Sequence, residues 1–158
     1  TDIGPQNAEA KSIEADANSF ASQLILPDYL VWPWVADRKP SLDLASAMGA
    51  DFQASLTAST LKLLQRTKVP IAITCHDQRR LKWSRRSRDF STDFYILNEL
   101  HQDTVAFDMA FGAAKGLSRP KRESASRWIR GPGVYRLEVW SQSIRLPEGS
   151  VLTMLEVV

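Results

Sequence analysis

The sequence predicts an α+β protein in which a helical N-terminal part is followed by a mostly antiparallel sheet with further helices. Three observations support this. Apolar residues recur at helical spacing up to about residue 66, the period changes from 3.6 to 2 after Pro70, and strand-like segments return from residue 134 to the end. Strands at both ends of the second part, with helices between them, are typical of an α+β fold.

The first predicted helix covers residues 8–26. Its apolar side chains share one stripe of the helix surface, namely Ile13, Ala17, Phe20, Ala21 and Leu24. Pro27 ends this helix, and Asp28 is expected to cap a short helical turn over residues 29–31. The stretch LVWPWVADRKP that follows contains two prolines and is interpreted as a linker that rests its tryptophans on a neighbouring surface.

Two shorter helices are expected next. Ser41 is the expected N-cap of a helix over residues 42–48 that stops at Gly49. A second helix runs from about Thr57 to Arg66. Two short helices around a glycine-containing turn resemble a helix-turn-helix.

Two hairpins are predicted in the remainder of the chain. IAITCH and LKWSRR form the first hairpin, which turns at about Asp77–Arg79. Residues 134–146 and 150–158 form the second hairpin, which turns at Pro147–Gly149. Between the hairpins, Asp103 is expected to cap a helix at 104–111, and Pro120 is expected to open another at 121–130.

The composition is typical of a globular chain. Of 158 residues, 44% are hydrophobic and 24% are charged, and no apolar run approaches the roughly 20 residues that span a bilayer. The N-terminal segment lacks the basic and apolar regions of a secretory signal. Cys75 is the single cysteine, so no intrachain disulfide is expected, and a reducing, cytoplasmic location without a membrane partner is predicted.

Catalytic motifs are scarce in this sequence. It contains no HExxH, CxxC, GxSxG or P-loop pattern. His76 and His101 are 25 positions apart, and each is expected to be an ordinary surface or hydrogen-bonded histidine. Cys75 has basic neighbours that lower a thiol pKa, yet no adjacent base-orienting group, and is interpreted as an inert strand cysteine.

The first predicted helix carries two polar residues at the edge of its apolar stripe. Glu14 and Asn18 lie one turn apart, side by side, rather than on the opposite polar face. This position suits a carboxylate that reaches into a site shared with a neighbouring helix. It also suits a solvated glutamate beside a core stripe, and the pattern alone leaves both interpretations open.

A longer segment around these two residues resembles a known family. EADANSFASQLILP, residues 14–27, is similar to the ExxANxFAxxLLxP helix of ImmA/IrrE-family zinc metallopeptidases. ADFQASLTA, residues 50–58, resembles the helix-turn-helix segment of that family, with its AxxFxVSxxA pattern. Residues 69–90 and 140–157 are similar to the longer members, whose C-terminal part is described as GAF-like.

The resemblance covers most of the chain from Ile13 onward and is weakest between residues 91 and 119. It implies three regions. Residues 1–38 would be the terminal helix and linker of a zincin-like peptidase domain, residues 39–68 a helix-turn-helix-like segment, and residues 69–158 a GAF-like α+β domain.

The resemblance also implies a zinc site. Glu14 would be the third zinc ligand, and Asn18 would steady a ligand from the next turn. The two histidines and the glutamate of HExxH have no counterpart in this sequence. Zinc is therefore expected in a complete protein, whereas this chain alone should neither bind zinc tightly nor cleave protein. An N-terminal HExxH segment, or a second copy of the chain, is the expected partner of the first helix.

The function implied by the resemblance is that of a bacterial, cytoplasmic zinc peptidase relative that acts on or alongside helix-turn-helix transcriptional repressors. In this interpretation the last domain is a sensor or a substrate-presenting module. A GAF-like fold would allow a small ligand between sheet and helices. The sequence does not indicate which ligand.

The alternative function is a nucleic-acid-binding regulatory module that uses the helices at 41–66 and a basic hairpin. Net charge is only +2, but basic residues gather in one segment, with a tryptophan interleaved for stacking: Arg79, Arg80, Lys82, Trp83, Arg85, Arg86 and Arg88. A looser basic group follows: Lys115, Arg119, Lys121, Arg122, Arg127 and Arg130.

Two observations count against this alternative. The second helix carries few residues suited to reading bases, namely Thr57, Ser59, Thr60 and Lys62. A charge run on an exposed strand is also typical of a solvated sheet edge. Any nucleic-acid affinity is therefore expected to be weak, indifferent to sequence and strongly salt-dependent.

Overall fold

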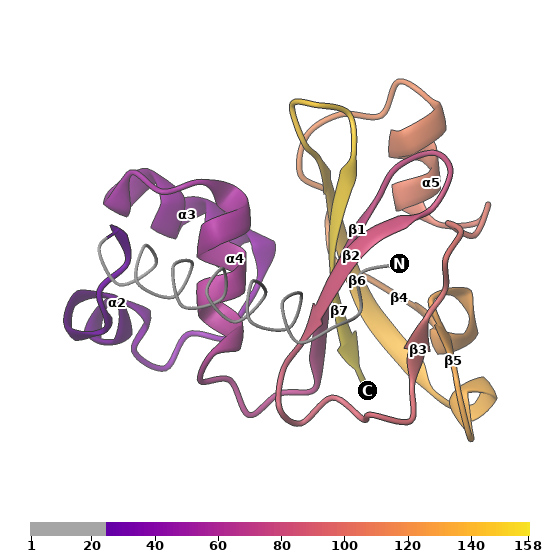
Figure 1. Ribbon diagram of the computed structural model, residues 1–158, viewed down its shortest axis with the longest axis horizontal. Helices are drawn as coiled ribbons and strands as arrows, with labels where there is room; N and C mark the ends of the chain where they lie inside the picture. The colour runs from indigo at the N-terminus through magenta and orange to yellow at the C-terminus, as the bar shows by residue number, and fades with distance from the viewer. Residues whose placement is uncertain (1–24) are drawn as a thin grey trace, which may run out of the picture.

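A five-stranded antiparallel sheet organises the part of the chain that the computed structural model describes, residues 25–158 (Figure 1). The strand order is β2-β1-β7-β6-β4, and neighbouring strands run antiparallel. The strands are β1 (Ile71–His76), β2 (Leu81–Arg86), β4 (Lys121–Ser124), β6 (Glu138–Arg145) and β7 (Val151–Val157). The predicted helix at 8–26, with Glu14 and Asn18, lies outside the described residues except for its last two positions.

Both predicted hairpins are confirmed. Ile71–His76 pairs with Leu81–Arg86 in β1 and β2, and the second hairpin forms from β6 and β7. The second hairpin starts later than expected, because residues 134–136 form a 3-10 turn, η2 (Val134–Arg136). β1 also pairs with β7, so the two hairpins share the centre of one sheet.

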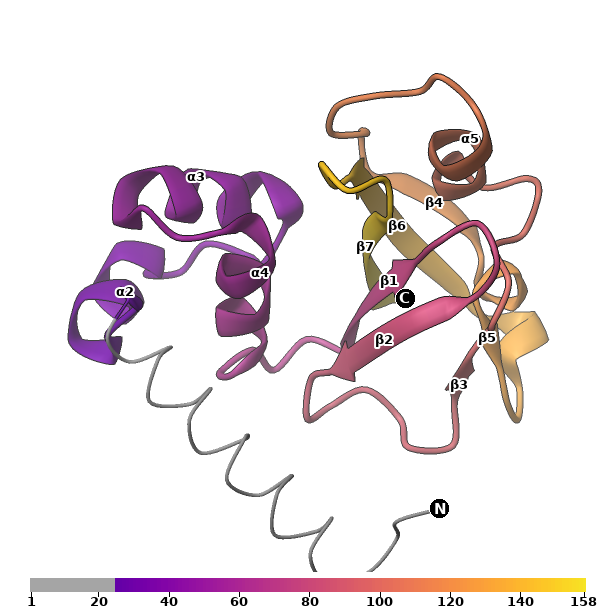
Figure 2. The ribbon, with the colours of Figure 1, turned by 45° about the horizontal axis from the view of Figure 1, so that its top comes forward.

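Three helices lie together beside one face of the sheet: α2 (Asp28–Val35), α3 (Leu42–Phe52) and α4 (Leu56–Leu64) (Figures 1 and 2). One hydrophobic cluster holds them to each other, with the buried residues Leu26, Val31, Val35, Leu44, Ala45, Met48 and Leu63. A second cluster joins α3 and α4 to the sheet, with Leu42, Leu64, Ile71, Ile73, Cys75, Leu152 and Met154.

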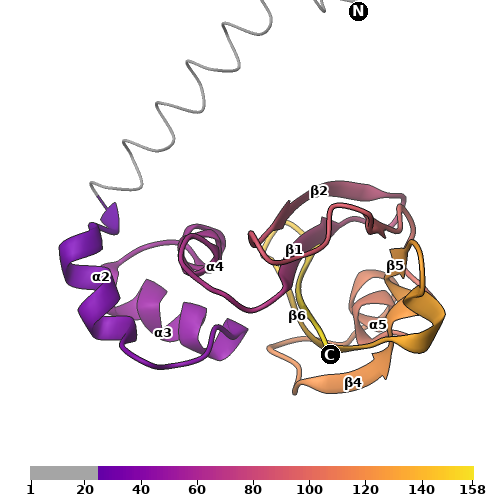
Figure 3. The ribbon, with the colours of Figure 1, turned by 90° about the horizontal axis from the view of Figure 1, so that it is seen from below.

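The opposite face of the sheet is covered by α5 (Val105–Phe111), by η1 (Ala125–Arg127) and by η2 (Figure 3). A short two-stranded sheet of β3 (Tyr95–Ile96) and β5 (Ile129–Arg130) lies on this side. A third cluster, which includes Ala72, Phe90, Met109, Trp128 and Leu155, fills the space between. The sheet is therefore the middle layer, and the hydrophobic clusters cross both predicted region boundaries, at residue 38 and at residue 68.

Gln142 on β6 is the main polar link between the helices and the sheet. Its carbonyl oxygen accepts the backbone N–H of Leu42 at 3.0 Å, and its amide nitrogen donates to Asp43 at 2.8 Å and to the Ser118 carbonyl at 3.1 Å. The Leu42 amide is one of the first in α3, where no carbonyl within the helix can accept it. The buried Gln142 side chain thus fixes the start of α3 against the sheet.

The prediction of a linker in this region is wrong, because residues 28–35 form a regular helix, α2, with Pro33 inside it. Its N-cap is Pro27 rather than Asp28, and no side chain caps it. Burial explains the helix, since Val31 and Val35 lie one turn apart and enter the cluster shared with α3 and α4.

The helix caps agree with the sequence in part. The Ser41 hydroxyl accepts from the Leu44 amide at 3.0 Å, as predicted. Gly49 does not end α3, which continues to Phe52 and is capped by Gln53 at φ 53°. A Cβ at Gly49 would lie 2.7 Å from the Ala54 carbonyl oxygen, so this glycine permits a close approach of the backbone.

Two further predictions are wrong. The N-cap of α5 is Thr104 rather than Asp103, since the Thr104 hydroxyl accepts the Phe107 amide at 3.2 Å. Residues 121–130 form β4, η1 and β5 instead of a helix. Ala125, Trp128 and Ile129 fall at helical spacing and are all buried, but a tight turn achieves that burial while β4 pairs with the edge of β6. Pairing of the backbone overrode the local pattern.

Replacement of Gln142 by methionine, of similar volume, should lower the free energy of unfolding by about 2 kcal/mol. The reason is that the buried Leu42 amide would lose its acceptor, and an unpaired buried donor costs about 1–3 kcal/mol. Urea unfolding measures the change. Gln102→Met, at an exposed turn position, is the matched control and should stay within about 0.5 kcal/mol of the unchanged protein. Equal effects of the two variants would contradict the assigned role.

Candidate functional site

The predicted zinc ligand Glu14 and its neighbour Asn18 precede the described residues. Within residues 25–158, no group of three histidine, cysteine, aspartate or glutamate side chains is arranged to hold a metal ion. The described residues therefore form no complete metal site by themselves.

The predicted basic surface is divided between the two faces of β2, the edge strand of the sheet. Trp83 is half-buried against the cluster shared with α4, and the Arg85 guanidinium lies 5.9 Å from its ring centre. Arg86 points to the other face, where it lies 5.4 Å from the ring of Phe90. The side chains needed for one nucleic-acid surface are thus not gathered on one surface.

Helix α4 also turns its polar side chains inward. Ser59, Thr60 and Lys62 are buried, with 0%, 0% and 1% of their surface exposed. The two hydroxyls donate to carbonyl oxygens one turn earlier in the same helix, at 2.9 and 2.7 Å. These side chains cannot reach base edges in a DNA groove. The helix pair α3–α4 is a structural layer in this protein, whatever its sequence resemblance.

Lys62 ties α4 to α2. Its ammonium group donates to the Asp28 carboxylate at 2.7 Å, and the Trp32 ring lies 5.6 Å from the nitrogen. Arg66 lies over the same ring at 4.9 Å. A buried ammonium is tolerated only when a partner offsets the loss of water, so the Asp28 carboxylate is required for this packing.

The outer side of α2 is apolar and exposed. Tyr29 and Leu30 expose 77% and 47% of their surface, and Pro33, one turn further, is exposed beside them. Ile25, just before α2, is 50% exposed. In the sequence this surface, which we call the α2 outer face, directly follows the segment that resembles the zinc-ligand helix. It is a candidate contact surface for another polypeptide.

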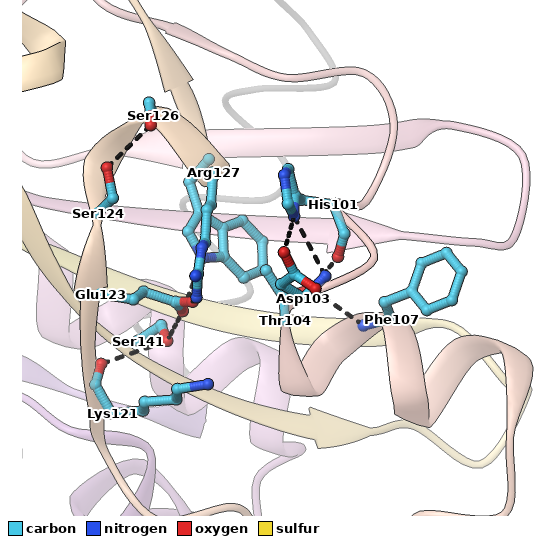
Figure 4. A network of polar contacts seen from close by, with 11 residues as sticks. His101, Asp103, Thr104, Phe107, Lys121, Glu123, Ser124, Ser126, Arg127 and Ser141 are labelled. Atoms are coloured by element: carbon cyan, nitrogen blue, oxygen red, sulfur yellow. Dashed lines mark hydrogen bonds and ion pairs between the residues drawn. The ribbon is translucent and has the colours of Figure 1, made fainter.

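Glu123 is the buried acid on the opposite side of the sheet (Figure 4). Its carboxylate accepts the Trp128 indole N–H at 3.0 Å and the Ser141 hydroxyl, and the Arg127 guanidinium lies 3.3 Å away. All its partners are side chains of neighbouring elements. The carboxylate, whose side chain is 1% exposed, therefore anchors η1 to β6.

Figure 4 also shows how His101 prepares the start of α5. Its ring nitrogen Nδ1 accepts the Asp103 backbone N–H at 3.1 Å, and its carbonyl accepts the Thr104 hydroxyl at 2.7 Å. Thr104 then caps the helix. His101 is thus a hydrogen-bonded histidine, as the sequence suggested.

His76 is buried at the end of β1, with 1% of its surface exposed. Its Nε2 lies 3.0 Å from the Leu97 carbonyl, and a carbonyl only accepts, so the proton of the neutral ring is on Nε2. Nδ1 is buried without a partner among the described residues. Burial lowers the pKa of His76, while the Leu97 carbonyl and the Asp77 charge oppose that shift.

Cys75 is also buried, and its thiol donates to the Ser150 hydroxyl at 3.5 Å. Burial raises the pKa of this thiol, which keeps it protonated and unreactive. The interpretation as an inert strand cysteine agrees with this geometry.

Two of the surface cavities in the described part are lined by segments that are far apart in the chain. One, of about 280 Å³, is a largely apolar groove beside Trp140, Met154 and Pro40. The other, of about 490 Å³, is polar and lies between the two hairpin turns. The sequence pattern indicates neither cavity, because the residues that line each one are distant in the chain.

The described helices include none that is long and apolar enough to cross a membrane. No protein-family model matches the sequence, and no curated protein sequence matches it. A functional assignment therefore rests on the residues and their geometry.

Stability should fall as the pH drops below about 6.5 because of His76. Its pKa is 6.5 in the unfolded chain and lower in the folded protein, so in this range the unfolded chain binds more protons. The stability that comes from keeping His76 neutral is fully present above about pH 6.5. It is lost as the pH falls toward the folded pKa, and the free energy of unfolding then changes by at most about 1.4 kcal/mol per pH unit.

Urea unfolding at several pH values measures this slope. His76→Gln retains a donor for the Leu97 carbonyl and lacks the titrating ring, so it should show a smaller slope over the same range. Identical slopes for the two proteins would show that another group is responsible.

Proposed function

We propose that this chain is the C-terminal part of an ImmA/IrrE-type zinc metallopeptidase that acts on or with helix-turn-helix transcriptional repressors. The basis is the segment EADANSFASQLILP, with Glu14 and Asn18 at the family spacing. One structural observation supports it above the others: the α2 outer face is apolar, exposed and directly continuous with that segment.

An exposed apolar helix face calls for a partner. Burial of a large apolar side chain contributes roughly 1.5–3 kcal/mol, so Tyr29 and Leu30 in water forgo several kcal/mol. In the proposal, an HExxH-bearing segment, or the same region of a second chain, covers the α2 outer face together with the apolar stripe that contains Ile13 and Phe20.

In the proposed site Glu14 donates one carboxylate to zinc, and the histidine ligands and catalytic glutamate come from the HExxH segment. Asn18 holds a ligand in place from one turn away. Zinc with an open coordination position supplies an activated water for peptide hydrolysis. Without the HExxH segment the chain would keep a single ligand and remain inactive.

The sheet part would be the sensor or substrate-presenting module. Its five-stranded antiparallel sheet, with α5 and the 3-10 turns on one face, is compatible with a GAF-like fold. The α3–α4 pair would connect this module to the peptidase part. Support for that comes from the two hydrophobic clusters in which α3 and α4 contact α2 on one side and the sheet on the other.

Zinc content is the direct test. In a polypeptide that carries this chain behind its HExxH segment, Glu14→Ala should reduce bound zinc several-fold, because tight binding needs all ligands together. Asp16→Ala, two positions along the same helix, should leave it unchanged. Elemental analysis after chelation and gel filtration gives the values. Equal losses in the two variants, or stoichiometric zinc in residues 1–158 alone, would refute the assignment.

A second test concerns the α2 outer face. If it is covered by another polypeptide, the chain should sediment as a dimer or co-purify with the HExxH segment, and Tyr29→Asp with Leu30→Asp should disrupt that association. Light scattering with intact mass analysis gives the stoichiometry. Tyr135→Asp, at a residue 73% exposed in η2, is the matched control and should change nothing. A strictly monomeric chain that recruits no HExxH segment would contradict the proposal.

A further inference from the structure

Both hairpins of the sheet turn at the same end, next to the end of α5 (Figures 1 and 2). Between these elements lies the polar cavity of about 490 Å³, which we call the hairpin cavity. Its lining comes from the β1–β2 turn, from the ends of β2, β6 and α5, and from the β6–β7 turn. A volume of this size suits a small molecule rather than a single ion.

Three cationic side chains line the hairpin cavity: Arg79, Lys82 and Arg145. None of the three forms an ion pair or a side-chain hydrogen bond with another described residue. Two basic residues within β2 differ, since Arg86 donates to the Ser91 carbonyl at 3.1 Å and Arg85 to the Ser84 carbonyl at 2.9 Å. The cations of the cavity are thus free to accept a ligand.

Two carboxylates of the cavity are already used within the turns. Asp77 accepts the backbone amides of Arg79 and Arg80 at 2.7 and 2.8 Å, and Glu148 accepts the Ser150 hydroxyl. These hydrogen bonds lower the pKa of both acids, so both stay ionised and fix the shape of the two turns. With three cations and two carboxylates, the lining has a charge of +1.

The backbone is adapted to the position of these cations. The pairing of β1 with β2 is irregular between Cys75 and His76, so Lys82 is the extra residue of a β-bulge. Bulges re-aim a side chain and are common beside functional sites. On the other hairpin, Gly149 at φ 100° lies beside Arg145, and a Cβ there would be 3.9 Å from the guanidinium. The site is closed toward α5 by Gln78, which donates to the Ala110 carbonyl at 2.7 Å.

We propose that the hairpin cavity binds a small organic phosphate between Arg79, Lys82 and Arg145. A singly charged ligand would gain little, because Asp77 and Glu148 offset most of the positive charge. A phosphate monoester carries close to two negative charges at neutral pH and three acceptor oxygens, which suit two forked guanidinium groups and an ammonium. The remaining volume accommodates the organic part.

Every residue of the hairpin cavity belongs to the sheet part, so binding there does not depend on the proposed zinc site. An organic phosphate would be the ligand of the sheet part, for which the sequence resemblance indicates no particular ligand.

Glycerol 3-phosphate is a suitable probe, with glycerol as its uncharged counterpart and inorganic phosphate as the bare anion. Calorimetric titration at about 0.15 M NaCl should give saturable binding of glycerol 3-phosphate, weaker binding of phosphate and none of glycerol. Amide shifts in a titration followed by NMR should be confined to residues 77–82 and 145–150 and to the end of α5 around Ala110.

Arg145→Gln should weaken binding at least tenfold, and Lys82→Gln, at an exposed position, should do so without affecting folding. Arg136→Gln in η2 is the matched control and should bind as the unchanged protein does. Thermal unfolding verifies that each variant is folded. The proposal would be overturned by a lack of saturable binding, by shifts elsewhere in the chain, or by equal affinity in the Arg145 and Arg136 variants. Binding that disappears at 0.15 M salt would likewise show only general attraction of anions.

Discussion

The position of Gln142 constrains the whole arrangement of helices on the sheet. An amide side chain buried on a sheet face must satisfy its oxygen and its nitrogen at once, and here the start of α3 offers both a donor, Leu42, and an acceptor, Asp43. That pairing sets where α3 begins and which way it points. Because α4 packs on α3 and α2 packs on both, the polar contact on β6 determines the position of the entire helical layer.

Two other contacts between elements also depend on a buried polar side chain. Lys62 holds α2 to α4 through Asp28, and Glu123 holds η1 to β6 through Trp128 and Ser141. The surrounding apolar clusters supply the larger part of the stability, but they are tolerant of small shifts between elements. A buried charged group does not tolerate such shifts, because displacement by even a few ångströms leaves it unpaired.

The sequence predicted those elements whose pattern and burial agree. The two hairpins form at the predicted segments, and Ser41 is a cap because its hydroxyl satisfies a local amide. Prediction failed where distant contacts decided the outcome. Residues 121–130 follow a helical pattern, yet β6 has a free edge that pairs with the first four of them. Pro33 suggests a break, but the buried Val31 and Val35 keep α2 intact.

Of the candidate sites, the basic segment was visible in sequence, whereas the hairpin cavity depends on Lys82 and Arg145 meeting from different strands.

The layout places the hairpin cavity and the helical layer at connected points of the sheet. β1 leaves α4 after a short connection and ends at His76, next to the turn that bears Asp77 and Arg79. Ile71, Ile73 and Cys75 along this strand pack in the cluster that also contains Leu64 of α4 and Leu42 of α3. A ligand that holds the two hairpin turns together would therefore act on a strand that also packs against α3 and α4. By linkage, a ligand that favours one arrangement of β1 and the helical layer must bind that arrangement more tightly, by the same free energy. Since α2 adjoins the segment with Glu14, a sensor role for the sheet requires no element beyond β1 and the helices packed on it.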